Sequence, residues 1–592
     1  MVNDRFSSIV EENLTILNKY FQNSKYLELN ILNQEEASEF LDYFIKTSFV
    51  RTTSIIFNTK KSQENLPPNV IFRSPHQAAK TNIIVGNTLE ILEQYFENHE
   101  GEILQHRRCL YILILLSYKQ ERFVSSLLRK LWVEKRILNA ILYIPCEKNF
   151  MYIYRPFEVR NNQYGVIEKS DCVGVRKSPL LVLNNVKNLN GFPLKVSIFS
   201  RGITALLETP KCLKNYRIYD KIPYTSGMYG FDGVLTSEIS LALNFTVSKI
   251  EGFNEFGVVY NKSSATGTAG QILRNEADLQ GNPRFVTWSS LLNFVEYTEY
   301  FAYDQLCVVV SKSVSIPKWI GPFINIKSSV WIGLLMILIV STLFNHILTP
   351  PSQRKLMNSW IEVFGVSISQ CLPRFTKKTR IFSIIVLFGS INISSLFNAT
   401  MYKAYTIESY YPDIKTLEEL DRSNLEIKGS LKPFANSFYE IYQSLDRKTS
   451  SNYRGSALDS VVRSGKRFAA FERYHDANIL LRSKYVNKDG TPMLHLIPEC
   501  PVYYYLSLIV PKSSPFLAEI NLVITRLREG GFNIKWYNDF ADALVYEKLI
   551  NVSTKENHLK ALNISDIQIS IYILFVGYFV SLLVLCGEIL MF

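Results

Sequence analysis

Few side chains in this sequence are spaced for covalent or metal chemistry. The eight cysteines form no CxxC pair, and the seven histidines form no HExxH motif, so no metal site is predicted. No nucleophile, base and orienting group stand in an order that a hydrolase would need. We therefore expect neither an enzyme nor a cofactor, and the pairing of the cysteines stays open.

The polar side chains with the clearest chemical meaning lie within an apolar stretch at residues 355–405. Its second half, 381–402, has no charged residue across 22 positions, which is enough for a transmembrane helix of roughly 20 residues. Its first half, 356–373, contains the lone carboxylate of Glu362. An ionisable group at membrane depth predicts a role in an ion or substrate pathway.

The first half of this stretch is basic at both ends, with Arg354 and Lys355 before it and Arg374 and Lys378 after it. Lys and Arg beside membrane segments stay on the cytoplasmic side, so a segment flanked by them twice is expected to enter and leave by one face. Irregular backbone at that depth must be buried in protein or line water, which favours a pore loop. The alternative is an amphipathic helix lying on the membrane.

Two further uncharged runs, 328–353 and 567–587, bring the predicted number of spans to three. The 592 residues are enough for two or three domains besides these spans. The net charge of +12 is spread along the chain without any finger or RNP spacing, so we expect no nucleic-acid partner.

The remaining sequence predicts α/β structure. Residues 1–188 alternate helical patterns with short apolar runs. Residues 230–247 read as turn, helix and strand, and the helix is expected to bury Leu235, Ile239, Ala242 and Leu243. After the second span, 513–536 predicts a capped helix that ends at Gly530 and Gly531. Two half-domains separated by membrane segments are best explained if they close on each other outside the membrane.

Glycosylation sequons fit this sidedness, because they are acceptors only outside the cytoplasm. The candidate acceptors all lie in segments that the basic loops place outside; they are Asn13, Asn244, Asn261, Asn551 and Asn563. The first 30 residues hold no basic region followed by an apolar core, so no signal peptide is found. We therefore expect that the start of the chain is incomplete or misplaced.

Several short motifs then occur in the order of the ionotropic glutamate receptor superfamily. Residues 277–287 are similar to its ADIAxAPxTIT run, residues 394–400 resemble a degraded SYTANLAAF gate motif, and 514–536 resemble its SPL and ExGxxxxW pattern. The resemblance implies a membrane protein with a bilobed, periplasmic-binding-protein-like α/β ligand-binding domain split by an α-helical channel domain. Its implied parts are an N-terminal extracellular region 1–188, a first lobe 189–327, a transmembrane helix 328–349, a re-entrant pore loop 355–379, a pore-lining helix 380–403, a second lobe 404–563 and a last helix 566–588.

Departures from the family motifs point to a subfamily. No arginine lies between Phe285 and Phe301, where glutamate receptors clamp the ligand's carboxylate, and a serine there replaces neither its charge nor its fork. The chain thus resembles the divergent insect chemosensory ionotropic receptors, which implies a ligand other than glutamate. The implied ligand-binding residues are Thr287, Ser289, Ser290 and Glu472.

The same resemblance assigns the channel residues. Gln370 lies near the family's selectivity position, and Glu362 on the pore helix adds a charge that attracts cations. Glu362 has two other readings, a pair with a base of a neighbouring subunit or exposure to the cytoplasm. The implied gate residues are Ser394, Ser395, Asn398 and Thr400, for which plain helix packing is the alternative.

The function implied is a ligand-gated cation channel subunit that detects a small-molecule tastant or odorant. Its implied setting is a hetero-tetramer with co-receptor subunits in the plasma membrane of sensory neurons. Two other functions are open: a non-conducting subunit that tunes the ligand response, which the eroded gate motif permits, and an unrelated multipass transporter, which would normally show more spans and internal repeats.

Overall fold

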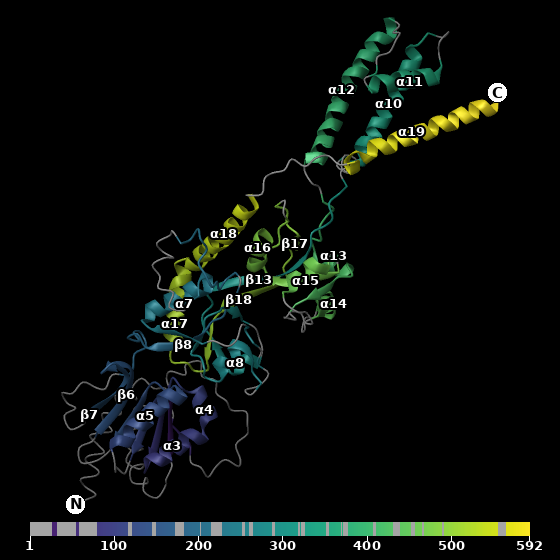
Figure 1. The fold of residues 1–592 in the computed structure, drawn as a ribbon. Helices are drawn as coiled ribbons and strands as arrows, with labels where there is room; N and C mark the ends of the chain where they lie inside the picture. Colours follow the sequence, from purple (N-terminus) through teal and green to yellow (C-terminus); the bar gives the residue numbers. More distant parts are fainter. Residues whose placement is uncertain are drawn as a thin grey trace, which may run out of the picture. The chain divides into compact units, whose positions relative to one another are not determined.

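A computed structural model describes most of the chain. The residues described are 26–31, 55–58, 80–115, 121–144, 150–171, 183–201, 203–214, 228–250, 255–257, 259, 264–286, 290–317, 320, 326–350, 355–368, 370, 377–406, 410–429, 439–450, 456–464, 467–487, 490–553 and 564–591. They form two compact units: a first unit of Met1–Leu306, Arg473–Ser483 and Cys500–Ile550, and a second unit of Cys307–Glu472, Lys484–Glu499 and Asn551–Phe592. Helices and strands are labelled in Figure 1.

The N-terminal part of the first unit is a seven-stranded sheet in the order β2-β1-β3-β4-β5-β6-β7. Its strands are β1 (Tyr26–Ile31), β2 (Ile55–Asn58), β3 (Lys80–Gly86), β4 (Leu110–Leu115), β5 (Ala140–Ile144), β6 (Phe150–Arg160) and β7 (Gln163–Asp171). The strands pair in parallel from β2 to β5, and β5, β6 and β7 are antiparallel. Every residue of β4 is buried, as expected for a parallel strand covered on both faces.

Three helices accompany this sheet: α3 (Leu89–Asn98), α4 (Glu100–Gln105) and α5 (Glu121–Lys135). Helix α3 buries Leu92 and Phe96, which are four residues apart and so share one face. The mixed α/β character predicted from the sequence is therefore confirmed.

The rest of the first unit is built around a three-stranded parallel sheet in the order β10-β8-β9. Its elements are β8 (Pro193–Ser197), α7 (Gly230–Leu243), β9 (Thr246–Ile250), α8 (Gly267–Leu273) and β10 (Leu279–Gln280). Helix α7 buries Leu235, Ile239 and Leu243 as predicted. The prediction for Ala242 is wrong, because Ala242 is exposed on the outer face of the last turn.

Segments far apart in the sequence pair to complete the first unit. Strand β11 (Arg284–Phe285) is antiparallel to β18 (Val502–Ser507), and β12 (Val295–Tyr297) is antiparallel to β19 (Ile509–Pro511). The short helix η3 (Ser290–Asn293) lies between β11 and β12 in the chain, and α16 (Tyr474–Ser483), α17 (Leu517–Glu529) and α18 (Phe532–Ser553) also contribute to this unit. Helix α17 ends at Gly530 as predicted, and Gly531 takes the positive φ of 72° that suits glycine.

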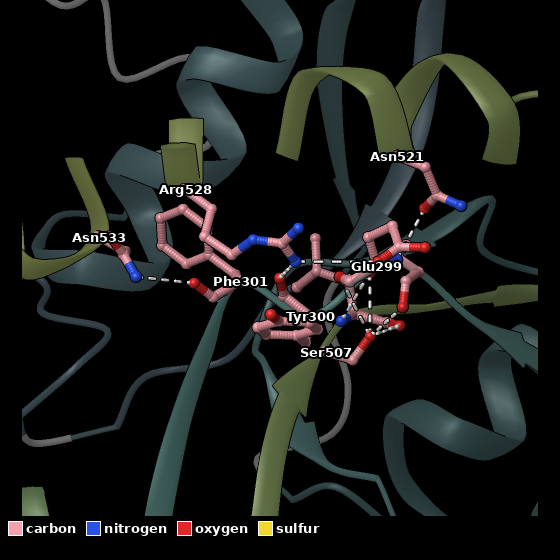
Figure 2. A network of polar contacts seen from close by, with 9 residues as sticks. Glu299, Tyr300, Phe301, Ser507, Asn521, Arg528 and Asn533 are labelled. Carbon is pink, nitrogen blue, oxygen red and sulfur yellow. Dashed lines mark hydrogen bonds and ion pairs between the residues drawn. The ribbon is translucent and has the colours of Figure 1, made fainter. Parts of the chain in front are cut away.

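A polar network fixes residues 299–301 against α17 and α18 (Figure 2). Arg528 Nη1 donates to the carbonyl of Tyr300 at 2.8 Å, and its guanidinium lies 3.9 Å from the centre of the Tyr300 ring. The amide of Glu299 donates to Asn521 Oδ1 at 2.8 Å, and Asn533 Nδ2 donates to the carbonyl of Phe301 at 3.0 Å. These bonds satisfy backbone amide and carbonyl groups of residues 299–301, which lie between β12 and β13.

Ion pairs between buried and partly buried side chains link the N-terminal sheet to the rest of the first unit. Arg136 binds both carboxylate oxygens of Asp278, at 3.0 and 3.2 Å. Arg108 pairs with Glu296 and donates from Nε to the carbonyl of Ser514 at 2.8 Å. Arg108 therefore connects the two sequence segments that meet at the β12–β19 pair.

Aromatic packing reinforces the same junction. The ring of Trp132 in α5 lies 5.5 Å from Phe157 and 6.2 Å from both Phe192 and Phe516, in edge-on arrangements. Trp132 and Phe157 belong to one hydrophobic core with Leu194 and Phe516. A shared core of this kind makes the N-terminal sheet a packed part of the unit.

Apart from its apolar helices, the second unit contains short elements around β13 (Ala302–Ser311), which begins in the first unit. Strand β14 (Glu426–Lys428) pairs in parallel with β15 (Thr449–Ser450) and β16 (Phe468–Arg473), and β17 (Leu494–Leu496) is antiparallel to the end of β13. The helices are α13 (Leu417–Arg422), α14 (Glu440–Arg447) and α15 (Ala457–Ser464). Cys307 and Cys500 are both disulfide-bonded.

The apolar helices of the second unit are α10 (Ser328–Leu348), α11 (Leu356–Ser367), α12 (Lys377–Thr406) and α19 (Ile564–Met591). Within the described part of the chain, two segments are long and apolar enough to cross a membrane, Ser328–Leu348 and Arg380–Lys403, with mean hydropathies of 2.0 and 1.8. Within α19 the apolar run Leu574–Gly587 is shorter. Helix α11 packs against α10 and α12, while the re-entrant course and the third span stay predictions.

Candidate functional site

A cluster of ionic side chains lies within the first unit, where β8, α7, β13 and α16 bring them together. Its acidic members are Asp232 in the first turn of α7, Asp304 in β13 and Asp476 in the first turn of α16. All three are buried, with 1 to 3% of their surface exposed. Buried carboxylates are stable only when they are paired or hydrogen-bonded, so their partners define the site.

Asp232 is held by neutral donors. Thr204 Oγ1 and Asn282 Nδ2 donate to Asp232 Oδ2 at 3.0 and 2.8 Å. The Asn282 side chain is fixed in turn by the amide and carbonyl of Phe199, at 2.9 and 3.0 Å. Burial raises the pKa of Asp232 to about 6, although Arg201 and these hydrogen bonds act in the opposite direction.

The start of α16 is held by an ion pair and by hydrogen bonds. Arg201 Nη2 binds Asp476 Oδ2 at 2.6 Å, and His475 Nδ1 lies 2.7 Å from Asp304 Oδ1. Tyr537 Oη donates to the backbone carbonyl of His475 at 2.9 Å. Burial, followed by the charges of Asp476 and Asp304, raises the pKa of Tyr537. Charge-assisted bonds of this length are stronger than neutral ones, so they fix the orientation of α16.

Three arginines surround the ring of Phe256, and we call them the arginine cluster: Arg201, Arg284 and Arg473. Their guanidinium carbons lie 5.5, 5.7 and 5.6 Å from the centre of that ring. Arg473 also lies 4.4 Å from the ring centre of Phe285. These distances are within the range of cation–π attraction.

Nearby acids offset the charges of the arginine cluster, because Asp476, Asp304 and Asp232 act on Arg473 and Arg201 pairs with Asp476. Burial, followed by repulsion from Arg201, lowers the pKa of Arg473 to about 10. Burial also lowers the pKa of Arg284. Among the residues that the structure describes, the Nη1 atom of Arg284 is shielded from solvent and has no hydrogen-bond partner. A shielded donor without a partner costs free energy, so this end of the Arg284 side chain destabilises the fold locally.

The predicted grouping of the ligand-binding residues stays a prediction, because Glu472 is the one of them whose side chain the structure describes. Thr287 and Ser289 lie outside the described residues, and Ser290 begins η3 but its side chain is not described. Glu472 lies in β16 with its side chain partly buried. Two charged residues of this site were not predicted from the sequence. They are Arg284, which directly precedes the interval without an arginine, and Asp232, an acid within the apolar turn and helix of residues 230–243.

The predicted glycosylation sites are described only in part. Asn244 ends α7 in an exposed left-handed conformation, and its Nδ2 donates to Asn188 Oδ1 at 2.8 Å. Asn551 lies in α18, but its side chain is not described. Asn13, Asn261 and Asn563 lie outside the described residues.

Among the predicted pore residues, Glu362 has a partner within its own chain. Asn345 Nδ2 in α10 donates to Glu362 Oε2 at 3.0 Å. The pair lines a small cavity between α10, α11 and α12, together with Phe382 and Ser383. Asn345 is buried and Glu362 is partly buried, so the bond fixes the side of α11 that faces α10.

Gln370 and the predicted gate residues have simpler surroundings. Gln370 is exposed, and its backbone amide donates to the carbonyl of Gly365 at 2.8 Å. All four predicted gate residues lie on α12: Ser394, Ser395 and Asn398 are exposed, and Thr400 Oγ1 donates to the carbonyl of Phe397 at 2.7 Å. An exposed polar stripe on an apolar helix is available for packing or for lining water.

The fold thus defines a protein of mixed α/β structure with apolar helices that are long enough to cross a membrane, compatible with a membrane protein. No family model matches the chain. The chain is similar to a curated protein from Anas platyrhynchos named "Probable glutamate receptor", with 21% identity over 331 residues. The alignment covers 50% of this chain and 65% of that protein, which is less than two thirds of its length. The match supports a distant, ionotropic glutamate receptor-like relationship.

Proposed function

We propose that this chain is a subunit of a ligand-gated cation channel that acts as a chemosensory receptor for taste or smell. The observation that carries the proposal is the similarity to a glutamate receptor in a chain whose apolar helices interrupt its α/β structure. The order of α10, the short helix α11 and α12 suits two spans and a pore loop between them. The partners in this proposal are co-receptor subunits of a hetero-tetramer in the plasma membrane of sensory neurons.

The proposed ligand differs from glutamate. The interval between Phe285 and Phe301 has no arginine, so the glutamate clamp of the family is not reproduced there. The ionic cluster of the first unit instead joins α7, β13 and α16. A ligand that changes the balance of these ion pairs would move α16, which directly follows β16 in the chain. Differential affinity for two arrangements of α16 is what would drive gating.

The proposed path from ligand to pore runs through the chain segments that join the α/β structure to the membrane helices. These are residues 311–327 before α10 and 403–415 after α12. Tension on them would bend α12 near Ser394 and Thr400. A ring of Gln370 amides from the subunits would select ions by size and dipole more than by charge, which suits monovalent cations.

The test is to express the chain alone and with candidate co-receptors, and to record membrane currents while tastants and odorants are applied. The proposal predicts ligand-evoked cation currents that require this chain. A current that is carried equally well by the co-receptors alone, at every ligand tested, would contradict it.

A further inference from the structure

We infer that the cavity between α10, α11 and α12 is a site for one monovalent metal cation of the size of Na⁺. The Glu362 carboxylate would neutralise the cation, and Asn345 and Ser383 would supply further oxygen ligands. All three helices belong to one chain, so the site is separate from an ion pathway shared between subunits. The inference goes beyond the proposed channel function and does not depend on it.

Contacts between the three helices surround the cavity. Asn345 Nδ2 in α10 donates to Glu362 Oε2 in α11 at 3.0 Å. The ring of Phe344 in α10 lies 5.1 Å from the ring of Phe382 in α12, and α11 also packs against α12. The cavity is therefore enclosed by helices of a single subunit.

The cavity has room for one small occupant. Its volume of about 10 Å³ is close to the space that a single water molecule needs, and Na⁺ is smaller than water. Packed protein interiors contain few voids of this size. A hydrated ion would not fit, so a cation at this place has to be bound directly by oxygen atoms of the lining.

The lining offers one oxygen-bearing side chain from each helix: Asn345 from α10, Glu362 from α11 and Ser383 from α12. Because the Asn345 amide uses its nitrogen to donate to Glu362, its oxygen keeps its capacity as a ligand. Carboxylate, carbonyl and hydroxyl oxygens are the ligands that hard cations prefer. The other lining residues are apolar; they are Val363, Val366, Phe382 and Val386.

The charge of the occupant follows from Glu362. This carboxylate is partly buried between α10 and α12, which contain the two apolar segments of membrane length, and a charge without a counter-charge is costly there. In the part of the chain that the structure describes, its partner is the neutral Asn345 amide, and no lysine or arginine pairs with it. A monovalent cation leaves the site neutral, whereas a divalent cation would leave an uncompensated positive charge.

The experiment measures thermal unfolding of the full-length chain, purified in detergent, in NaCl and in choline chloride at equal ionic strength and neutral pH. Choline is too large for the cavity, so it controls for ionic strength. A cation that binds only the folded chain raises the unfolding midpoint as its concentration rises. We expect the midpoint to rise with the Na⁺ concentration and to stay constant with choline.

Two variants test the ligands. Glu362→Gln should abolish the shift with Na⁺, because it removes the charge and keeps an acceptor for Asn345. Ser383→Ala removes one neutral ligand and should need about three- to tenfold more Na⁺ for the same shift. The matched controls are Glu440→Gln and Ser329→Ala, which change exposed side chains of the same unit and should respond to Na⁺ as the wild type does.

The inference is overturned if choline stabilises the wild type as well as Na⁺ does, or if a cooperatively unfolding Glu362→Gln variant keeps the wild-type response to Na⁺. Stabilisation that depends on pH and not on Na⁺ would assign Glu362 to a proton and would also overturn it. A shift that Gln370→Ala abolishes and Glu362→Gln leaves intact would place the cation at the proposed pore, with the same consequence. A response to Na⁺ that requires Glu362, in a chain that gives no evoked current, would support the inference while contradicting the proposed channel function.

Discussion

Arg136 and Asp278 form an ion pair in which one nitrogen, Arg136 Nη2, lies 3.0 and 3.2 Å from the two carboxylate oxygens. Their side chains are 14% and 5% exposed, so the pair lies in the interior of the first unit. Asp278 also accepts from the backbone amide of Lys195 at 3.1 Å. Arg136 directly follows α5, which accompanies the N-terminal sheet, and Asp278 directly precedes β10. The pair therefore joins the N-terminal sheet to the sheet that contains β8 and β10.

Removing one partner of this pair should lower the free energy of unfolding more than replacing both partners with apolar residues. Asp278→Ala leaves the Arg136 charge buried, which should cost about 3 to 5 kcal/mol of the free energy of unfolding. The double variant Arg136→Met with Asp278→Leu should lose clearly less, because no charge remains buried. Thermal unfolding of the full chain measures both. A double variant as unstable as Asp278→Ala would contradict this account of the junction.

Truncating a ring of the aromatic junction around Trp132 should destabilise the first unit. Phe516→Ala removes a ring that is 2% exposed and packs against Trp132 and Phe157, so a loss of about 3 to 5 kcal/mol is expected. Phe123→Ala is the control, because Phe123 is an exposed phenylalanine in α5. A small effect at Phe516 would mean that the N-terminal sheet is not packed against it in solution.

Asp232 should make the first unit less stable as the pH rises. Its pKa of about 6 in the fold exceeds the ordinary value of 3.8, so the folded chain holds this proton more tightly than the unfolded chain. The stabilisation by the proton is complete below pH 4 and is lost as the pH rises through 6. The difference corresponds to about 3 kcal/mol.

Asp232→Asn should remove this contribution and keep the hydrogen-bond acceptor. Unfolding by denaturant at several pH values, compared between the wild type and this variant, isolates the effect of Asp232 from other titrating groups. The wild type should lose stability relative to the variant between pH 4 and 7. A constant difference across that range would contradict the raised pKa.

Asn345→Leu tests the contact between α10 and α11. It leaves the Glu362 carboxylate without its amide donor at 3.0 Å, which should reduce the amount of folded receptor at the cell surface. Glu362→Gln should be tolerated far better, because a glutamine oxygen can still accept from Asn345. Surface labelling and quantification of both variants decide the point. Equal surface levels for Asn345→Leu and the wild type would show that the bond is dispensable.

Sequence patterns were informative where burial follows a simple period. The buried positions Leu235, Ile239 and Leu243 of α7 followed from helical spacing, and the end of α17 at Gly530 followed from helix-stop residues. The error at Ala242 arose because helical spacing does not show where the partner surface of a helix ends. Periodicity predicts a face, and only packing determines its width.

The arginine cluster could not be predicted from the sequence, for a different reason. Arg201, Arg284 and Arg473 are far apart in the chain and reach one ring through three different elements. No local spacing encodes such a meeting. The partner of Glu362 was missed likewise, because Asn345 lies in another helix and an isolated Asn gives no signal of a contact.

The central claim, that this chain contributes to the pore of a ligand-gated cation channel, is tested most directly by recording from Gln370→Arg. The variant and the wild type are each expressed with the same co-receptors, and the reversal potential of the ligand-evoked current is measured in defined cation gradients. A positive charge at the exposed Gln370 should lower cation permeability and shift the reversal potential. An evoked current of unchanged reversal potential, from receptors shown to contain the variant, would contradict the claim.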